Sequence, residues 1–137
     1  MTYIAICDES ALACVAYPPA RYQGYTFEGA AFSVNKDTDS DTENKCLASL
    51  KPPVQTESIN EVEFKTAYQS SAGMGHGMSQ YSYRTFHNGA CYELDIRIAM
   101  SSMGGYSPGT IKEFTDADEQ KVRVSLANFL STFRFLK

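Results

Sequence analysis

Residues 80–98 read QYSYRTFHNGACYELDIRI, and this stretch decides the fold. Apolar and polar side chains alternate on both sides of a central Asn88-Gly89 pair, as they do in strands that have one apolar and one polar face. Asn-Gly can occupy the two positive-φ positions of a type I′ turn. The sequence therefore predicts an antiparallel β-hairpin with a two-residue loop at Asn88 and Gly89.

The hairpin loop also sets the register, because residues that face each other across it have numbers that add up to 177, as 88 and 89 do. In this register apolar side chains meet on one face, and oppositely charged or polar side chains meet on the other. The expected pairs are Tyr83 with Leu94, Tyr81 with Ile96, Arg84 with Glu93, Gln80 with Arg97, and Phe86 with Cys91.

Further strands are expected on the N-terminal side of this hairpin. Residues 62–68 show the same alternation, and residues 27–34 are predicted to form another strand. Residues 3–7 and 12–17 are predicted as two short strands that end before Pro18-Pro19. Residues 45–50 are predicted as a short helix, which a capping box of Ser40 and Glu43 opens and Pro52-Pro53 ends.

A second helix is expected after the Gly/Ser/Pro loop of residues 101–109. Thr115 can cap it, and acidic residues in its first turn suit the positive end of the helix dipole. We expect this helix to lie across the apolar face of the sheet, with residues 132–136 as a candidate edge strand. Its apolar face is predicted to comprise Val122, Leu126, Phe129, Leu130 and Phe133. The fold class is thus α+β, in a single domain over residues 1–137.

The composition excludes several classes of protein. With 43% apolar and 20% charged residues, the 137-residue chain is globular and is long enough to bury a core. Its net charge of -4 argues against a nucleic-acid-binding surface, which needs a basic patch. The longest apolar run, residues 11–17, is far shorter than the ~20 residues of a transmembrane helix, so no membrane span is expected.

The four cysteines lack Cys-x-x-Cys and zinc-like spacings. We expect two disulfides, Cys7 with Cys14 and Cys46 with Cys91, because Cys91 points away from the apolar face of the hairpin and is available to the short helix. Two disulfides predict a location outside the cytoplasm, in the periplasm or as a secreted protein. The alternative is four buried free thiols, which would indicate a cytosolic protein. No signal-peptide pattern precedes Tyr3, so a signal peptide is expected to have been removed.

The order of these elements resembles the PsbP-like family of small α+β domains. The resemblance rests on Ala16-Tyr17-Pro18 after two short strands, on the antiparallel meander, and on residues 130–135 at the end of the amphipathic helix. Residues 83–94 are also similar to segments of exported bacterial proteins of unknown function. The resemblance implies a helix-flanked antiparallel sheet, an extracytoplasmic location and an accessory or binding role, but no catalytic residue.

Catalytic signatures are absent from the sequence. There are two histidines, His76 and His87, and neither a Gly-x-Ser-x-Gly nor a His-Glu-x-x-His motif. Residues 73–77 lack the third glycine and the following helix of a dinucleotide-binding loop, and residues 37–41 lack the glycine of an EF-hand loop. We therefore expect no enzyme activity and no cofactor. An enzyme with an unfamiliar site would need a pocket with His76 or a carboxylate of shifted pKa.

One cluster is compatible with metal binding. Met74, His76 and Met78 alternate along the chain, and the register brings Met100 opposite residue 77, with Met103 at the same end of the hairpin. Thioether and imidazole ligands suit Cu(I). The alternative is that these methionines fill an irregular corner of the core. The first functional hypothesis is a domain that binds a protein partner or a small ligand, and the second is a soft-metal-binding protein.

Overall fold

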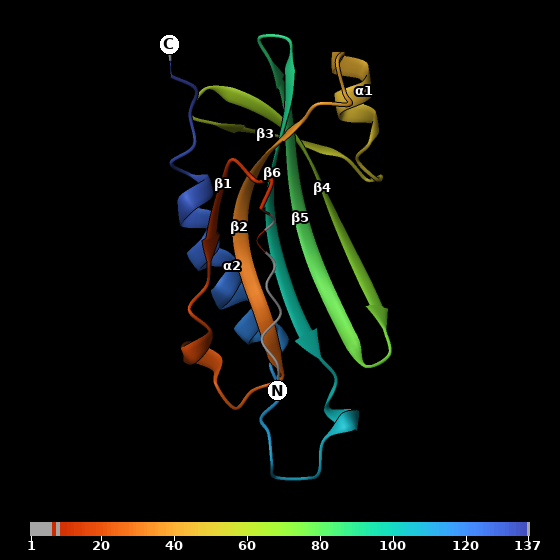
Figure 1. Cartoon of the computed structure of the whole chain (residues 1–137), viewed down its shortest axis with the longest axis vertical. Helices are drawn as coiled ribbons and strands as arrows, with labels where there is room; N and C mark the ends of the chain where they lie inside the picture. Colours follow the sequence, from red (N-terminus) through yellow and green to blue (C-terminus); the bar gives the residue numbers. More distant parts are fainter. Residues whose placement is uncertain (1–6, 8, 137) are drawn as a thin grey trace.

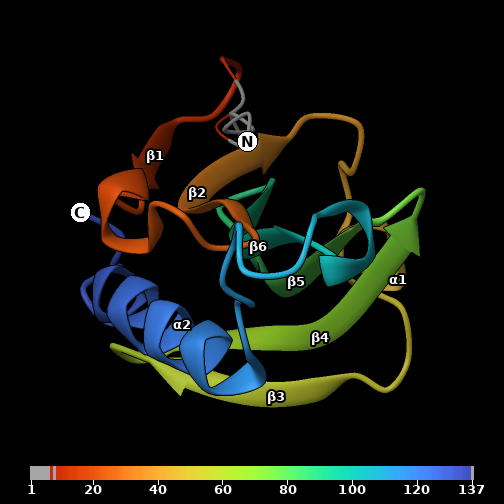
Figure 2. The same ribbon diagram turned by 90° about the horizontal axis from the view of Figure 1, so that it is seen from below.

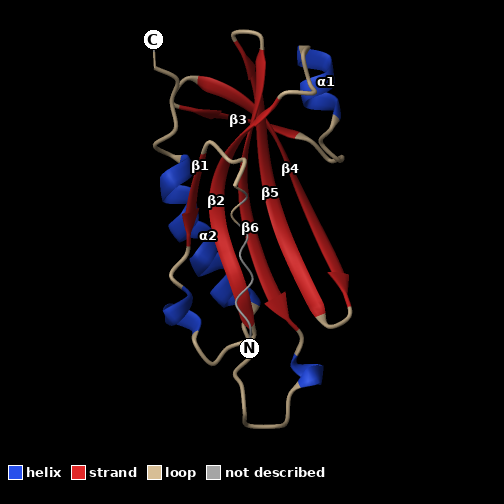
Figure 3. Ribbon diagram, viewed as in Figure 1, coloured by secondary structure: helices blue, strands red, loops and turns tan. Residues whose placement is uncertain are grey.

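The computed structural model describes Cys7 and residues 9–136. Over these residues the chain forms an antiparallel six-stranded sheet, in the order β1-β2-β6-β5-β4-β3, and two α-helices (Figures 1 and 3). The strands are β1 (Ala13–Ala16), β2 (Phe27–Asp37), β3 (Gln55–Ile59), β4 (Val62–Gly73), β5 (His76–His87) and β6 (Ala90–Ser101). The helices are α1 (Glu43–Ala48), α2 (Asp116–Leu130) and the 3-10 turns η1 (Pro19–Tyr22) and η2 (Met103–Gly105).

The sheet curves around α2. Figure 2 shows the two edge strands, β1 and β3, on either side of this helix, which contacts β2 and β6. The short helix α1 contacts β5 and β6 instead. The α+β class with a C-terminal helix on one face of an antiparallel sheet is thereby confirmed. Among the described residues, no helix is both long and apolar enough to cross a membrane.

The hairpin of β5 and β6 has the predicted register. Asn88 and Gly89 have φ values of 49° and 76°, as the type I′ turn requires. All five expected pairs form, and the polar pairs also make contacts: Arg84 donates to Glu93 at 2.6 Å, and Arg97 donates to Gln80 at 3.2 Å. The local turn chemistry is sufficient to set the register because one slip would exchange the apolar and polar faces.

The largest side chains of the core lie between the sheet and α2. The largest fully buried apolar side chains are Phe64, Leu94, Ile96, Ile98, Val122 and Leu126. Thr115 forms the predicted cap, in a reciprocal capping box with Asp118. The prediction for Phe129 is wrong: its side chain is 43% exposed, because it lies about 60° around the helix from Leu126, at the edge of the buried stripe. Phe133 packs on the core from beyond the end of the helix.

The C-terminal segment does not form the predicted edge strand. Residues 133–136 have no regular secondary structure. Two side chains hold this segment in place: the Asn60 amide donates to the carbonyls of Ser131 and Phe133 at 2.8 Å, and the Phe133 ring packs on Phe64 at 5.7 Å. Because the Asn60 side chain binds these carbonyls and the Phe133 ring packs on the core, side-chain contacts rather than strand pairing hold this segment.

The start of α1 also differs from the prediction. Thr42 is the N-cap, and its hydroxyl accepts from the backbone N–H of Lys45. Ser40 donates its hydroxyl to Asp37 at 2.8 Å instead, so the expected capping box with Glu43 does not form. The strand predicted at 27–34 extends to Asp37, and the one predicted at 12–17 is β1. The strand predicted at 3–7 lies outside the described residues except for Cys7, which is not in a strand.

Candidate functional site

Both predicted disulfides are present. Cys46 and Cys91 join α1 to β6 with a Cα–Cα distance of 5.5 Å, and Cys7 and Cys14 are joined at 5.8 Å. Among the described residues there is no free cysteine. Two disulfides are expected of a protein that folds in an oxidising compartment.

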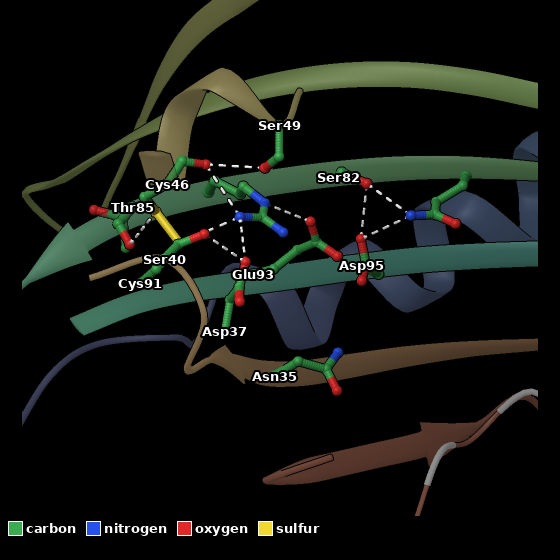
Figure 4. A network of polar contacts seen from close by, with 12 residues as sticks. Asn35, Asp37, Ser40, Cys46, Ser49, Ser82, Thr85, Cys91, Glu93 and Asp95 are labelled. Carbon is green, nitrogen blue, oxygen red and sulfur yellow. Dashed lines mark hydrogen bonds and ion pairs between the residues drawn. A yellow bond between two sulfur atoms is a disulfide. The ribbon is translucent and has the colours of Figure 1, made fainter. Parts of the chain in front are cut away.

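A polar network surrounds the Cys46–Cys91 disulfide on the sheet face opposite α2 (Figure 4). Arg84 is its centre: the guanidinium donates to Glu93 at 2.6 Å, to Asp37 at 3.0 Å and to the Cys46 carbonyl at 3.1 Å. Hydrogen bonds from Ser40 and Arg84 lower the pKa of Asp37. The ions of this network are paired with one another, which is typical of a structural network that anchors α1.

Asp95 continues this network into the sheet. Its side chain is 0% exposed and accepts from Ser82 at 2.8 Å, while Oδ2 makes no hydrogen bond and lies 3.5 Å from the Arg97 guanidinium. Burial and the neighbouring Glu93 carboxylate raise the pKa of Asp95 to about 7, against the weaker opposing effect of Arg97. The polar face of the hairpin is therefore buried at Asp95. A fully enclosed carboxyl cannot meet a substrate, so Asp95 is not a catalytic candidate.

One cleft is lined by residues of η1, the start of β2 and the loop before α2. Its volume is about 640 Å³, which is in the range of small-molecule sites. The lining residues are Pro19, Ala20, Tyr22, Gln23, Gly24, Phe27, Tyr106, Thr110 and Ile111. None of these side chains is charged at neutral pH, and neither His76 nor any carboxylate is among them. The cleft therefore offers an apolar, aromatic surface with a few neutral polar groups.

Backbone hydrogen bonds join the walls of this cleft. Thr26 donates its N–H to the Lys112 carbonyl, and Lys112 donates to the Gly24 carbonyl, both at 2.9 Å. Gly24 has a φ of 85°, in the left-handed region that glycine adopts without strain. These bonds tie the loop before α2 to the segment before β2, so the cleft is preformed.

Tyr22 and Tyr106 are held by their hydroxyl groups. Tyr22 donates to Asp118 in α2 at 3.4 Å, and its ring lies against Phe114 at 5.0 Å and Phe27 at 5.5 Å. The Tyr106 hydroxyl is hydrogen-bonded to Ser101 at 3.1 Å. Because both hydroxyls have partners within the protein, the two side chains contribute mainly their ring carbons to the cleft.

A second cleft, of about 540 Å³, lies between β3 and α2. It is more polar, since Glu57 and Arg123 are among its lining residues. Arg123 stacks over the Tyr81 ring at 4.2 Å from the ring centre. Because side chains of opposite charge line this cleft, it indicates no preferred charge for a ligand. The class of ligand is therefore less well defined here than in the first cleft.

The structure separates the four residues of the predicted metal cluster: three lie in strands, on two different faces of the sheet, and Met74 lies in a turn. Met100 pairs with Gly77, and its sulfur would lie 3.9 Å from a Cβ placed at Gly77, so it shares that residue's face. His76 and Met78 alternate with Gly77 and therefore lie on the opposite face. Met74, in the turn between β4 and β5, is 99% exposed, and Met78 and Met100 both pack partly on the core. The structure thus brings His76 and Met78 to one face without Met100.

Sequence reasoning missed Glu28 and the cleft. Glu28 is buried in β2, and its carboxylate lies 2.6 Å from Nδ1 of His76. The available signal was that Glu28 is the one charged residue in the apolar strand predicted at 27–34. For the cleft, the signal was the concentration of aromatic residues around Pro18-Pro19 in residues 17–27.

Comparison with known proteins adds no functional residue to these. No family model matches the chain, and curated proteins include no significant match to it, so the candidate sites rest on the chain's own geometry.

Proposed function

We propose that this chain is a non-catalytic binding domain of an extracytoplasmic compartment, periplasmic or secreted, and that it binds a small uncharged, largely apolar molecule in the 640 Å³ cleft. The observation that carries the proposal is the lining of the cleft: the described residues around this space of ligand size are aromatic, aliphatic or neutral polar, and none of them is charged. The two disulfides support the location, because they persist in oxidising compartments.

The resemblance to PsbP-like domains supports an accessory role rather than catalysis. Neither a histidine nor a carboxylate is found among the described residues that line the cleft, and these are the groups that general acid–base chemistry uses most often. A small ligand fits the concave, preformed cleft better than a protein partner, whose surface would meet only its rim. Binding of a small neutral molecule is therefore the form of the hypothesis that we adopt.

A neutral fluorescent probe tests this function. N-phenyl-1-naphthylamine brightens in apolar surroundings, and we expect saturable binding of one probe molecule per chain. Ala20→Trp places a bulky ring in the cleft from an exposed position of η1 without removing a side-chain hydrogen bond. This variant should weaken probe binding at least 10-fold.

The matched control is Val124→Trp, which adds the same side chain at an exposed position of α2 that lines the second cleft. It should leave probe binding unchanged. Absence of saturable binding, or equal loss in the two variants, would contradict the assignment to the cleft. If the probe does not bind and a protein partner binds at the rim of the cleft, protein binding would be favoured instead.

A further inference from the structure

A buried glutamate holds an exposed histidine at the start of β5. Glu28 is 4% exposed, and its Oε1 lies 2.6 Å from Nδ1 of His76, whose own side chain is 59% exposed. Within the part of the chain that the structure describes, no other hydrogen-bonding partner of the Glu28 carboxylate is found. The two residues come from β2 and β5, 48 positions apart, and meet across the end of β6.

This contact determines which nitrogen of the ring is free. A carboxylate accepts a hydrogen bond, so the proton of neutral His76 lies on Nδ1 and the lone pair lies on Nε2. Metal-binding histidines characteristically donate their second ring N–H to a carboxylate, which fixes the ring and makes the ligand nitrogen more basic. Glu28 therefore gives His76 the orientation and tautomer of a metal ligand.

Two thioethers are close to this nitrogen along the chain. Met78 is two residues further on β5 and lies on the same face as His76, where its side chain is partly buried and packs against core residues. Met74 is in the turn that joins β4 to β5, with a φ of 53°, and its side chain is 99% exposed. A methionine so completely in water fills no part of the core. A Cβ at Gly73 would have nothing within 4 Å, whereas a Cβ at Gly75 would lie 3.6 Å from the Ser102 hydroxyl.

We propose that His76 Nε2, Met74 Sδ and Met78 Sδ form a binding site for a soft monovalent cation, Cu(I) or Ag(I), with Glu28 as the positioning residue of His76. Thioether and imidazole donors select such cations over Mg²⁺ and Ca²⁺. Met100, on the other face of the sheet, is not a ligand, so the set differs from the one predicted from the sequence. This proposal does not depend on the cleft, so a negative result for one of the two proposed sites leaves the other proposal unaffected.

The ligand set is tested by metal titration of the oxidised chain. Cu(I) is kept reduced with ascorbate and delivered from a chromophoric Cu(I) chelator, since a thiol reductant would open the disulfides and create new ligands. We expect one equivalent to bind. Met74→Leu and Met78→Leu should each weaken binding at least 10-fold. Met100→Leu is the matched control, with the same change on the opposite face, and should bind as the parent chain does.

The role of Glu28 is tested by NMR of the His76 ring nitrogens. In the metal-free parent chain at pH 8 we expect the Nδ1–H tautomer, the less common one in water, and Ag(I) should shift the Nε2 resonance. Glu28→Gln should weaken Cu(I) binding 10- to 100-fold. The His87 ring, stacked on Phe135 at 3.7 Å, is an internal reference that should not respond to Ag(I).

Three results would overturn the site: no Cu(I) bound by the oxidised chain, loss of binding in Met100→Leu as large as in Met78→Leu, or an Nε2–H tautomer of His76. The tautomer is measured on the parent chain, so it decides the role of Glu28 even where Glu28→Gln does not fold. Circular dichroism of each variant identifies those that keep the fold.

Discussion

At the scale of single residues, Asp95 makes the stability of the fold depend on pH. Its carboxyl is enclosed in the sheet, and one of its two oxygens has no hydrogen-bond donor. An ionised carboxylate in this position lacks the solvation that water gives it, so the protonated form is favoured and the pKa is raised to about 7. The folded state therefore binds this proton more tightly than the unfolded state, in which the pKa of Asp is about 3.8.

This shift predicts that the fold loses stability with rising pH. The contribution of Asp95 to the free energy of unfolding is complete below pH 3.8 and is lost as the pH rises towards about 7. The loss is on the order of a few kcal/mol. Asp95→Asn resembles the protonated side chain, because its carbonyl can still accept from Ser82. In urea unfolding, this variant should be more stable than the parent at both pH 5 and pH 8, and the difference should be larger at pH 8. Equal differences at both pH values would show that Asp95 does not titrate in this range.

At the scale of the elements, the long hairpin of β5 and β6 organises the sheet. It supplies the central strands, its register places the core side chains under α2, and Cys91 on its other face receives α1 through the disulfide. The hairpin depends on a two-residue turn in which Gly89 has a φ of 76°. The turn is open, since nothing lies within 4 Å of a Cβ at Gly89, so a substitution there tests the backbone conformation alone.

Gly89→Val should destabilise the fold, because a β-branched residue resists positive φ. The cost of the left-handed conformation is about 1–2 kcal/mol. Gly89→Asn is the matched control: asparagine also adds a Cβ but tolerates this conformation, so most of the stability should be kept. Thermal unfolding of the two variants measures the difference. Equal destabilisation by valine and asparagine would show that positive φ is not the cause.

At the scale of the whole molecule, the sheet curves around α2, and both proposed sites lie near one end of it. The β4–β5 turn, η1, η2 and the N-terminus of α2 gather at this end, at the bottom of Figure 1, whereas α1 and its disulfide are at the other end. The structural polar network and the candidate binding sites are therefore separated along the strands. Changes at the disulfide are expected to affect stability more than binding.

The two disulfides should differ in their contribution to stability. The loops that they close span 45 residues for Cys46–Cys91 and 7 residues for Cys7–Cys14. On the loop-entropy argument, replacing both cysteines of the longer loop by alanine should cost about 1.5 kcal/mol more than the same change in the shorter loop. Chemical denaturation of the two double variants without reductant gives the comparison. An equal or larger cost for the Cys7–Cys14 pair would contradict this ranking.

The sequence by itself determined the elements whose causes are local. Alternation on both sides of Asn88-Gly89 is enough to set the register, and the register places Cys91 on the face that faces α1, which led to the correct disulfide partner. Thr115 is recognisable as the cap of α2 because the acidic first turn of the helix follows it directly. In each of these cases the interacting groups are separated by a short turn or by the repeat of a strand or helix, so their geometry follows from the backbone period.

Only the tertiary structure decided which distant groups meet. The Glu28–His76 contact joins residues 48 positions apart, and the amide of Asn60 replaces strand pairing in a segment more than 70 residues away. The cleft is built by separate segments that are held together by backbone hydrogen bonds, and the enclosure of Asp95 depends on the packing of the sheet. No local period describes these contacts, because burial and long-range pairing depend on the free energy of the whole packed chain rather than on any one segment of it.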